Sequence, residues 1–138
     1  MVDLKTLSGQ LAEKGQDEES SFTFEINPIP GDVEVLQILI ENREELPIFL
    51  SFSDEQILCI SYLFKKEEVK NNKIDELNHA MLATNISIPL STFALLDDQY
   101  VIYGALSANS SLGDIVYEID ALSSNALEAI EAMSSYLN

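Results

Sequence analysis

The residues that most often perform chemistry are scarce in this sequence, which has one histidine, His79, and one cysteine, Cys59. His79 stands two residues from Leu77 and two from Met81, about 200° around a helix, so it is expected to point away from the apolar stripe. There is no second histidine that could share a metal ion with it. Cys59 lies in an apolar run, where a thiol behaves as a small buried hydrophobe. The sequence therefore predicts no catalytic residue and no metal site.

Acidic residues are abundant, and the adjacent pair Asp97-Asp98 is the best candidate for a cation site. A hairpin turn explains the pair better, because aspartate tolerates turn geometry. Whether the pair also holds a cation stays open, and no EF-hand spacing occurs. The glycines never cluster into a phosphate-binding loop, so no cofactor is implied. The five glycines are Gly9, Gly15, Gly31, Gly104 and Gly113.

The balance of charge argues against two classes of partner. The 138 residues include 24 acids and 7 Lys or Arg, for a net charge of −17. A surface of this sign repels nucleic-acid phosphates and anionic lipid headgroups, so neither is an expected partner. The most apolar windows, 33–40 and 56–64, are far shorter than the roughly 20 residues of a membrane helix, and residues 1–14 lack the apolar region of a signal peptide. We expect a cytoplasmic protein without membrane insertion.

The charges are unevenly distributed along the chain. Lys65, Lys66, Lys70 and Lys73 lie close together, and no Lys or Arg follows Lys73, although nine acids do. These acids either keep the protein soluble or form a face that steers a basic protein partner, whose binding would then weaken with salt. The lysines are either the solvated face of a helix or a docking patch.

Three segments have the spacing of amphipathic helices, and they span residues 3–14, about 66–84 and 111–137. Gly15 occupies the position of a residue that ends the first helix, and a polar loop follows at 16–21. Ser111 and Asp114 predict an N-terminal cap for the last helix. The side chains at 123–125 compete for backbone hydrogen bonds and predict a kink or a break there.

Six segments alternate or are dense in strand-forming residues, and they span 22–26, 33–41, 46–52, 56–64, 92–96 and 99–108. Pro28, Pro30 and Gly31 are expected to end the first strand, because they cannot hold a ladder of hydrogen bonds. Short turns between successive strands require an antiparallel sheet. The predicted class is α+β, in the order helix, three or four strands, helix, two strands, helix, within a single domain of residues 1–138.

One strand segment is unusually small and uncharged, and small residues let another backbone approach closely. Either the last helix packs on this segment, or it is the interface with a partner or with a second copy of the chain. The candidate interface residues are Tyr103, Gly104, Ala105, Leu106 and Ser107.

The sequence resembles the bacterial YjfI-like family, a domain of unknown function. The resemblance rests on segments 46–50 (LPIFL), 55–58 (EQIL), 88–91 (IPLS), 103–107 (YGALS), 115–119 (IVYEI) and 125–129 (NALEA). The order of elements is also similar to that of type III secretion chaperones and YbjN-like proteins, which are small, acidic and often dimeric binders of other proteins. The resemblance implies a groove beside the sheet for an extended partner segment, and a link to envelope stress through a phage-shock-type membrane coat protein. It implies no catalytic residues.

Two hypotheses for function follow. The first is a chaperone-like or adaptor module that is not an enzyme, acts as a homodimer and binds a protein partner. The second is a small-ligand or cation-binding protein, or an enzyme, with a carboxylate-lined pocket, which would need converging acids of raised pKa.

Overall fold

The computed structural model describes residues 4–15 and 22–138, and a six-stranded antiparallel sheet lies at its centre. The strands lie side by side in the order β1-β2-β3-β4-β6-β5. The predicted α+β class and the order of elements are confirmed, with four strands before the second helix. In chain order the helices and strands are α1 (Leu4–Gly15), β1 (Phe24–Ile29), β2 (Val35–Ile40), β3 (Ile48–Phe52), β4 (Gln56–Lys65), α2 (Ile74–Thr84), β5 (Thr92–Leu96), β6 (Gln99–Ser107) and α3 (Leu112–Ala132).

The sheet has two different faces, because successive side chains of a strand point to opposite sides. On the covered face, side chains such as Ile38 of β2 and Leu50 of β3 are fully buried in the core. On the other side, which we call the open face, the alternate side chains such as Leu39 and Phe49 are half-buried and do not belong to the core cluster. The register carries this division across neighbouring strands, since Leu50 pairs with Cys59 and Phe49 with Ile60.

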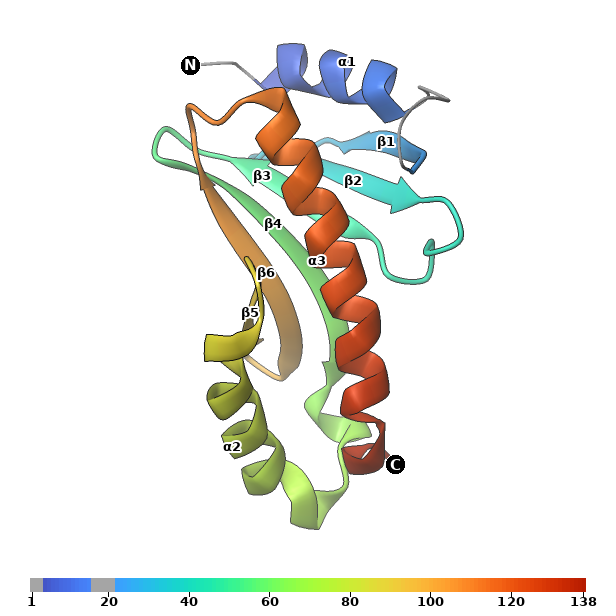
Figure 1. Ribbon diagram of the computed structural model, residues 1–138, viewed down its shortest axis with the longest axis vertical. Coiled ribbons are helices and arrows are strands. Elements are labelled where there is room, and N and C mark those ends of the chain that lie inside the picture. Colours follow the sequence, from blue (N-terminus) through green and yellow to red (C-terminus); the bar gives the residue numbers. More distant parts are fainter. Residues whose placement is uncertain (1–3, 16–21) are drawn as a thin grey trace.

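The α-helices lie on the covered face. Figure 1 shows α3 crossing the sheet diagonally, with α1 beside β1 at one end and α2 near β5 at the other. Ile119 and Leu122 of α3, Leu11 of α1 and Leu77 of α2 all belong to the same buried cluster as the covered face. Each such side chain stabilises the fold by about 1.5–3 kcal/mol when it leaves water. The described helices therefore use their apolar stripes on one side of the sheet and leave the other side open.

The first strand extends further than the sequence predicts. Pro28 was expected to end it, but β1 continues to Ile29 and Pro28 pairs with Leu36 of β2. The expectation is wrong because β1 is an edge strand. At an edge, the missing N–H of a proline can lie on the side that has no neighbouring strand, so the sheet loses no hydrogen bond.

The second helix is shorter than the sequence predicts. Residues 66–73 form two 3-10 turns, Lys66–Glu68 and Asn71–Lys73, and α2 begins at Ile74. Between these turns, Val69 is fully buried and its backbone bridges Leu137. The Asn138 N–H also donates to the Glu68 carbonyl at 2.9 Å. The end of the chain therefore holds this segment in turns that a continuous helix could not make.

The last helix is capped as predicted, but it is not interrupted. The Ser111 Oγ accepts a hydrogen bond from the Asp114 N–H at 3.1 Å, and α3 then runs unbroken through residues 123–125. The predicted kink is wrong because these side chains find other roles: Ser123 is buried, and the Asn125 Nδ2 donates to the Pro89 carbonyl and the Ser91 Oγ, both at 2.9 Å.

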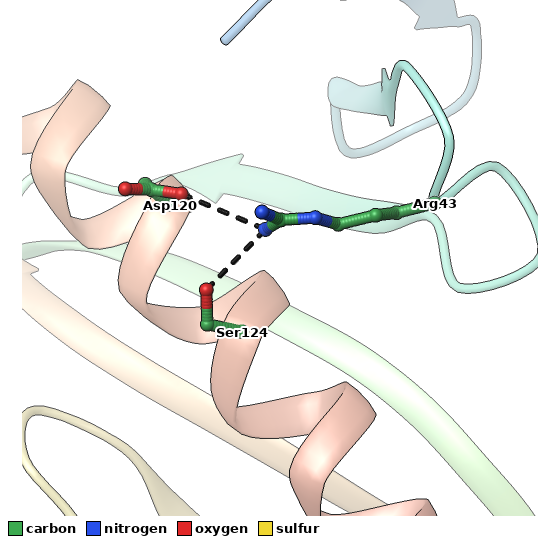
Figure 2. A network of polar contacts seen from close by, with 3 residues as sticks. All are labelled: Arg43, Asp120 and Ser124. Atoms are coloured by element: carbon green, nitrogen blue, oxygen red, sulfur yellow. Dashed lines mark hydrogen bonds and ion pairs between the residues drawn. The ribbon is translucent and has the colours of Figure 1, made fainter. Parts of the chain in front are cut away.

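A positively charged side chain from a loop contacts the outer side of α3. Arg43, between β2 and β3, reaches toward the helix, and its Nη1 lies 3.6 Å from Asp120 Oδ1 and 3.3 Å from Ser124 Oγ (Figure 2). Two of the acids that follow Lys73 therefore have a positively charged partner. Asp120 pairs with Arg43, and Glu76 Oε2 lies 2.9 Å from Lys73 Nζ. The Arg43–Asp120 pair is partly exposed and contributes at most about 1 kcal/mol, and the Lys73–Glu76 pair lies at the surface, where solvent screens it.

Gly15 belongs to α1 and does not follow it. The described glycines have no positive φ, so its role is not the left-handed turn that the sequence suggests. A Cβ at Gly15 would overlap the Phe24 carbonyl oxygen and lie 2.9 Å from the Phe24 ring. Glycine is needed because the end of the helix touches β1. The predicted helix start at Asp3 and the predicted loop at 16–21 lie outside the described residues.

This contact predicts the effect of two matched substitutions in one helix. Gly15→Ala should lower the free energy of unfolding by about 1–3 kcal/mol, because overpacking must be relieved against backbone. Gly9→Ala, where nothing lies within 4 Å of the new Cβ, should raise it by about 0.5–1 kcal/mol through helix propensity. Urea unfolding followed by circular dichroism measures both. Equal changes in the free energy of unfolding at the two positions would contradict the close contact between Gly15 and Phe24.

Candidate functional site

The open face of the sheet carries a continuous set of large apolar side chains. Phe49 and Tyr62 meet edge to face with their ring centroids 5.4 Å apart. Ile60 lies between Phe49 and Tyr103 in the register, and Tyr62 is 45% exposed. Val101 is only 1% exposed although it is outside the core cluster, so its neighbours on the open face bury it. Large apolar side chains on an uncovered side of a sheet are typical of an interaction site.

The open face is also almost free of charge. Among the residues of the described strands, only Glu25 and Lys65 are charged, and both lie toward the margins of the sheet. The remaining charges of a chain with a net charge of −17 lie on helices, turns and the segments outside the strands. The apolar face is therefore bordered by acidic surface.

The five residues singled out in the sequence are divided between the two faces. Tyr103, Ala105 and Ser107 point to the open face, and Ala105 and Ser107 are exposed. Gly104 and Leu106 point to the covered face, where Gly104 is buried against α3. Packing of the last helix therefore explains Gly104, while an interface remains available to Tyr103 and Ala105.

Beneath α3 lies a buried carboxyl group that sequence reasoning missed. Glu118 is 2% exposed, its Oε1 has no hydrogen-bond partner, and it occupies the space that a side chain at Gly104 would fill. Burial raises the pKa of the Glu118 carboxyl. The signal was present in the spacing, because Glu118 stands three residues after Ile115 and four before Leu122, on the apolar stripe of the helix.

Other polar groups under α3 are buried as well. Cys59 is fully buried, as predicted, and burial together with the Glu118 charge raises the pKa of its thiol to about 12. A thiol in this state is a poor nucleophile at neutral pH. The hydroxyls of Ser61 and Ser123 are also buried without a partner. The single histidine, His79, is exposed on α2, as the sequence predicts.

Asp97 and Asp98 form the turn between β5 and β6. Asp97 has φ 52°, and the Asp98 carbonyl accepts a hydrogen bond from the Lys66 N–H at 2.7 Å. The turn lines an open hollow of about 640 Å³, together with Lys65, Lys66 and Glu67. The hollow mixes lysines with acids and is not a carboxylate cage. Within 4–15 and 22–138, no group of three or more His, Cys, Asp or Glu residues is arranged to hold a metal ion.

No helix in the described part of the chain is both long enough and apolar enough to cross a membrane.

Comparison with known proteins connects this architecture to a family and a fold. The family model "Uncharacterized protein conserved in bacteria (DUF2170)" matches residues 1–137. The uncharacterised protein YjfI of Escherichia coli K12 is 30% identical over 105 residues, which make up 73% of this chain and 77% of YjfI. The resemblance to the YjfI-like family is therefore confirmed.

Two crystal structures share the fold. YbjN of Escherichia coli has a TM-score of 0.68 and 16% identity, covering 99% of this chain and 94% of its own. A chain of the ExsC–ExsE complex has a TM-score of 0.54 and 14% identity, with 94% and 96% covered. The fold resemblance to YbjN-like proteins and type III secretion chaperones is confirmed, and at these identities the likeness concerns the fold alone.

The buried carboxyl predicts a pH-dependent gain on substitution. Glu118→Gln should raise the free energy of unfolding at neutral pH, because an amide carries no charge to desolvate. The pKa of Glu118 is raised on folding above its ordinary 4.5. Wild-type stability from this group is therefore full below about pH 4.5 and is lost as pH rises through the higher folded value.

Urea unfolding between pH 4 and 8 should show the advantage of Glu118→Gln growing with pH. The matched control is Glu128→Gln, an exposed glutamate on the same helix, which should change stability by no more than about 0.5 kcal/mol throughout. If the gain in stability from Glu118→Gln did not vary with pH, the raised pKa of the Glu118 carboxyl would be contradicted.

Proposed function

This chain is a member of DUF2170, a family of uncharacterised bacterial proteins, and from that premise we propose that it is a chaperone-like module that binds a protein partner and catalyses no reaction. The observation that carries the proposal is the open face, which is apolar, nearly uncharged and not covered by any of the described helices. A folded monomer gains nothing from leaving such a face in water, whereas a partner segment that covers it contributes hydrophobic stabilisation.

Binding has more support than catalysis. The alternative, a pocket lined by acids, needs several carboxylates that converge on one hollow. In the parts of the chain described, Glu118 is the only buried acid, and it faces Gly104 and not a pocket. The hollow beside Asp97 and Asp98 is open and contains lysines. The two side chains that most often perform chemistry are also apart in burial, since Cys59 is fully buried and His79 is exposed on α2.

The partner has a definable chemistry. It presents an apolar segment to side chains such as Ile60, Tyr62 and Tyr103, flanked by Lys or Arg that meet the acidic border. Tyrosines at the centre of an apolar face are favoured anchors for binding. Acids around the face accelerate the encounter with a basic partner at low salt. The crystal structure of ExsC with ExsE offers a precedent in this fold for a complex of two different chains.

We place the protein in the cytoplasm as a homodimer, with a phage-shock-type membrane coat protein as its partner and envelope stress as its setting. The support is the resemblance to the YjfI-like family together with the acidic surface. This partner is the one to test first.

A pair of tyrosine substitutions tests the open face. Tyr62→Ser removes a ring that is 45% exposed at the centre of the face, and Tyr117→Ser removes one that is 67% exposed on α3. Titration calorimetry with the purified coat protein should show that Tyr62→Ser weakens binding by about 2 kcal/mol, or roughly 30-fold. Tyr117→Ser should leave the affinity unchanged, and wild-type affinity should fall when NaCl is raised from 50 to 300 mM.

Two results would count against the proposal. Equal affinity for both tyrosine variants would show that the open face is not the binding surface. No binding by the wild-type chain at either salt concentration would exclude the coat protein as the partner.

A further inference from the structure

The break between β4 and α2 is confined to two residues. A 3-10 turn lies on either side of them, Lys66–Glu68 before and Asn71–Lys73 after, and α2 follows directly. Val69 has φ −91° and ψ 139°, and Lys70 has φ −56° and ψ 129°, so the ψ angles of both lie outside the helical region. A change of ψ at these two residues would join both turns to α2 in one helix of residues 66–84.

The start of such a helix is already in place. The Lys65 N–H donates to Glu68 Oε2 at 2.9 Å, which is the bond that the third residue of a helix makes to the residue capping it. Glu67 and Glu68 lie in the first turn, where the positive end of a helix dipole favours acids. Apolar residues keep helical spacing from about 66 to 84, so the local sequence favours a continuous helix that the structure does not contain.

The contacts that maintain the break come from residues 136–138, which we call the strap. Its first carbonyl accepts a hydrogen bond from the Lys70 N–H, and its last N–H donates to the Glu68 carbonyl, both at 2.9 Å. Between these two bonds, Leu137 forms a backbone bridge with Val69, which is fully buried. Figure 1 shows the end of the chain, marked C, beside the segment that joins β4 to α2. The strap therefore contacts the two residues at which the helix is interrupted.

The strap occupies backbone groups that a continuous helix would need. In an α-helix each N–H bonds to the carbonyl four residues earlier. The Lys70 N–H would then donate to the Lys66 carbonyl, and the Glu68 carbonyl would accept from the Asn72 N–H. Both the Lys70 N–H and the Glu68 carbonyl are now bonded to the strap. The Lys70 N–H cannot point to both partners, so the seated strap and the continuous helix exclude one another.

We propose that residues 66–84 are a two-state element, in which the strap and a continuous helix compete for the same backbone groups. With the strap seated, two hydrogen bonds and the burial of Val69 favour the broken form. When the strap leaves, the break closes and α2 begins eight residues earlier, which adds about 12 Å to its length. A partner that binds the released strap, or the longer helix, shifts the population toward the continuous form.

The switch has a consequence for the surface next to α2. A groove of about 240 Å³ lies between α2 and β5, and its lining includes Met81, Leu82 and Phe93. A longer helix that still starts at the end of β4 cannot keep every residue of α2 in its present place. The shape of the groove therefore depends on the strap, although the strap is not part of its lining.

Backbone chemical shifts measured by NMR test the switch in a variant that releases the strap. Leu137→Asp replaces the half-buried side chain at the middle of the strap with a charge. The shifts of Val69 and Lys70 should change from extended to helical values, and circular dichroism should show a gain in helix. The matched control is Ser135→Asp, which adds the same charge at an exposed position two residues earlier, and there the shifts should stay extended. Extended or random-coil shifts of Val69 and Lys70 in Leu137→Asp would overturn the proposal.

A second variant tests the same equilibrium from the helical side and leaves the core intact. The double substitution Asn71→Ala, Asn72→Ala changes two exposed side chains and raises helix propensity where the continuous helix would run. Hydrogen exchange of the Asn138 amide, which is bonded only while the strap is seated, should become about five- to tenfold faster. The Leu122 amide, within α3, should exchange at its wild-type rate. An Asn138 amide that exchanges no faster than in the wild-type chain would show that strap and helix do not compete.

Discussion

The packing of α3 against one face of the sheet is the contact on which the rest of the molecule depends. It brings Ile119 and Leu122 into the core, and it is close enough at Gly104 that only a residue without a side chain fits beside Glu118. A helix that approaches this closely fixes which strand residues point to the covered face, since shifting a strand by one residue would exchange its two faces. The composition of the open face is then a consequence of this contact.

The charges follow the same division. Acids are tolerated on helices and turns, which reach solvent, and they are nearly absent from the strands, where a charge would face either the core or the apolar open face. Glu118 is the exception, because it is an acid on a helix that points into the core. Burial there favours the neutral form of its carboxyl, so the charged form lowers the stability of the fold. A fold that needed only solubility from its acids would have no reason to exclude them from an open sheet face. Their exclusion is what the proposed binding of a partner to the open face would require.

Sequence patterns predicted the fold well because period-two and helical spacings depend on local geometry. The six strands, the three helices and the Ser111 cap were all found, and so were the positions of Cys59 and His79. The errors arose where distant contacts decide. Pro28 stays in a strand because β1 is an edge, and residues 66–73 fold as turns because Leu137 pairs with Val69. Local sequence contains neither fact.

The candidate surfaces were only partly predictable, for a related reason. The small segment around Gly104 was recognised, but a strand sequence does not reveal which of its residues a helix will cover, so Tyr103 and Gly104 were grouped together although they point to opposite faces. The β5 edge could not be recognised before the strand order was known, because an uncharged strand is equally suited to the centre of a sheet. Once β5 is known to be last, its lack of charge has a different meaning. The residues that would be ordinary in the middle of the sheet lie at its edge, near the part of α2 that follows Glu76 and has no Asp, Glu, Lys or Arg. Strand order, more than composition, therefore decides that this apolar segment lies at the edge of the sheet.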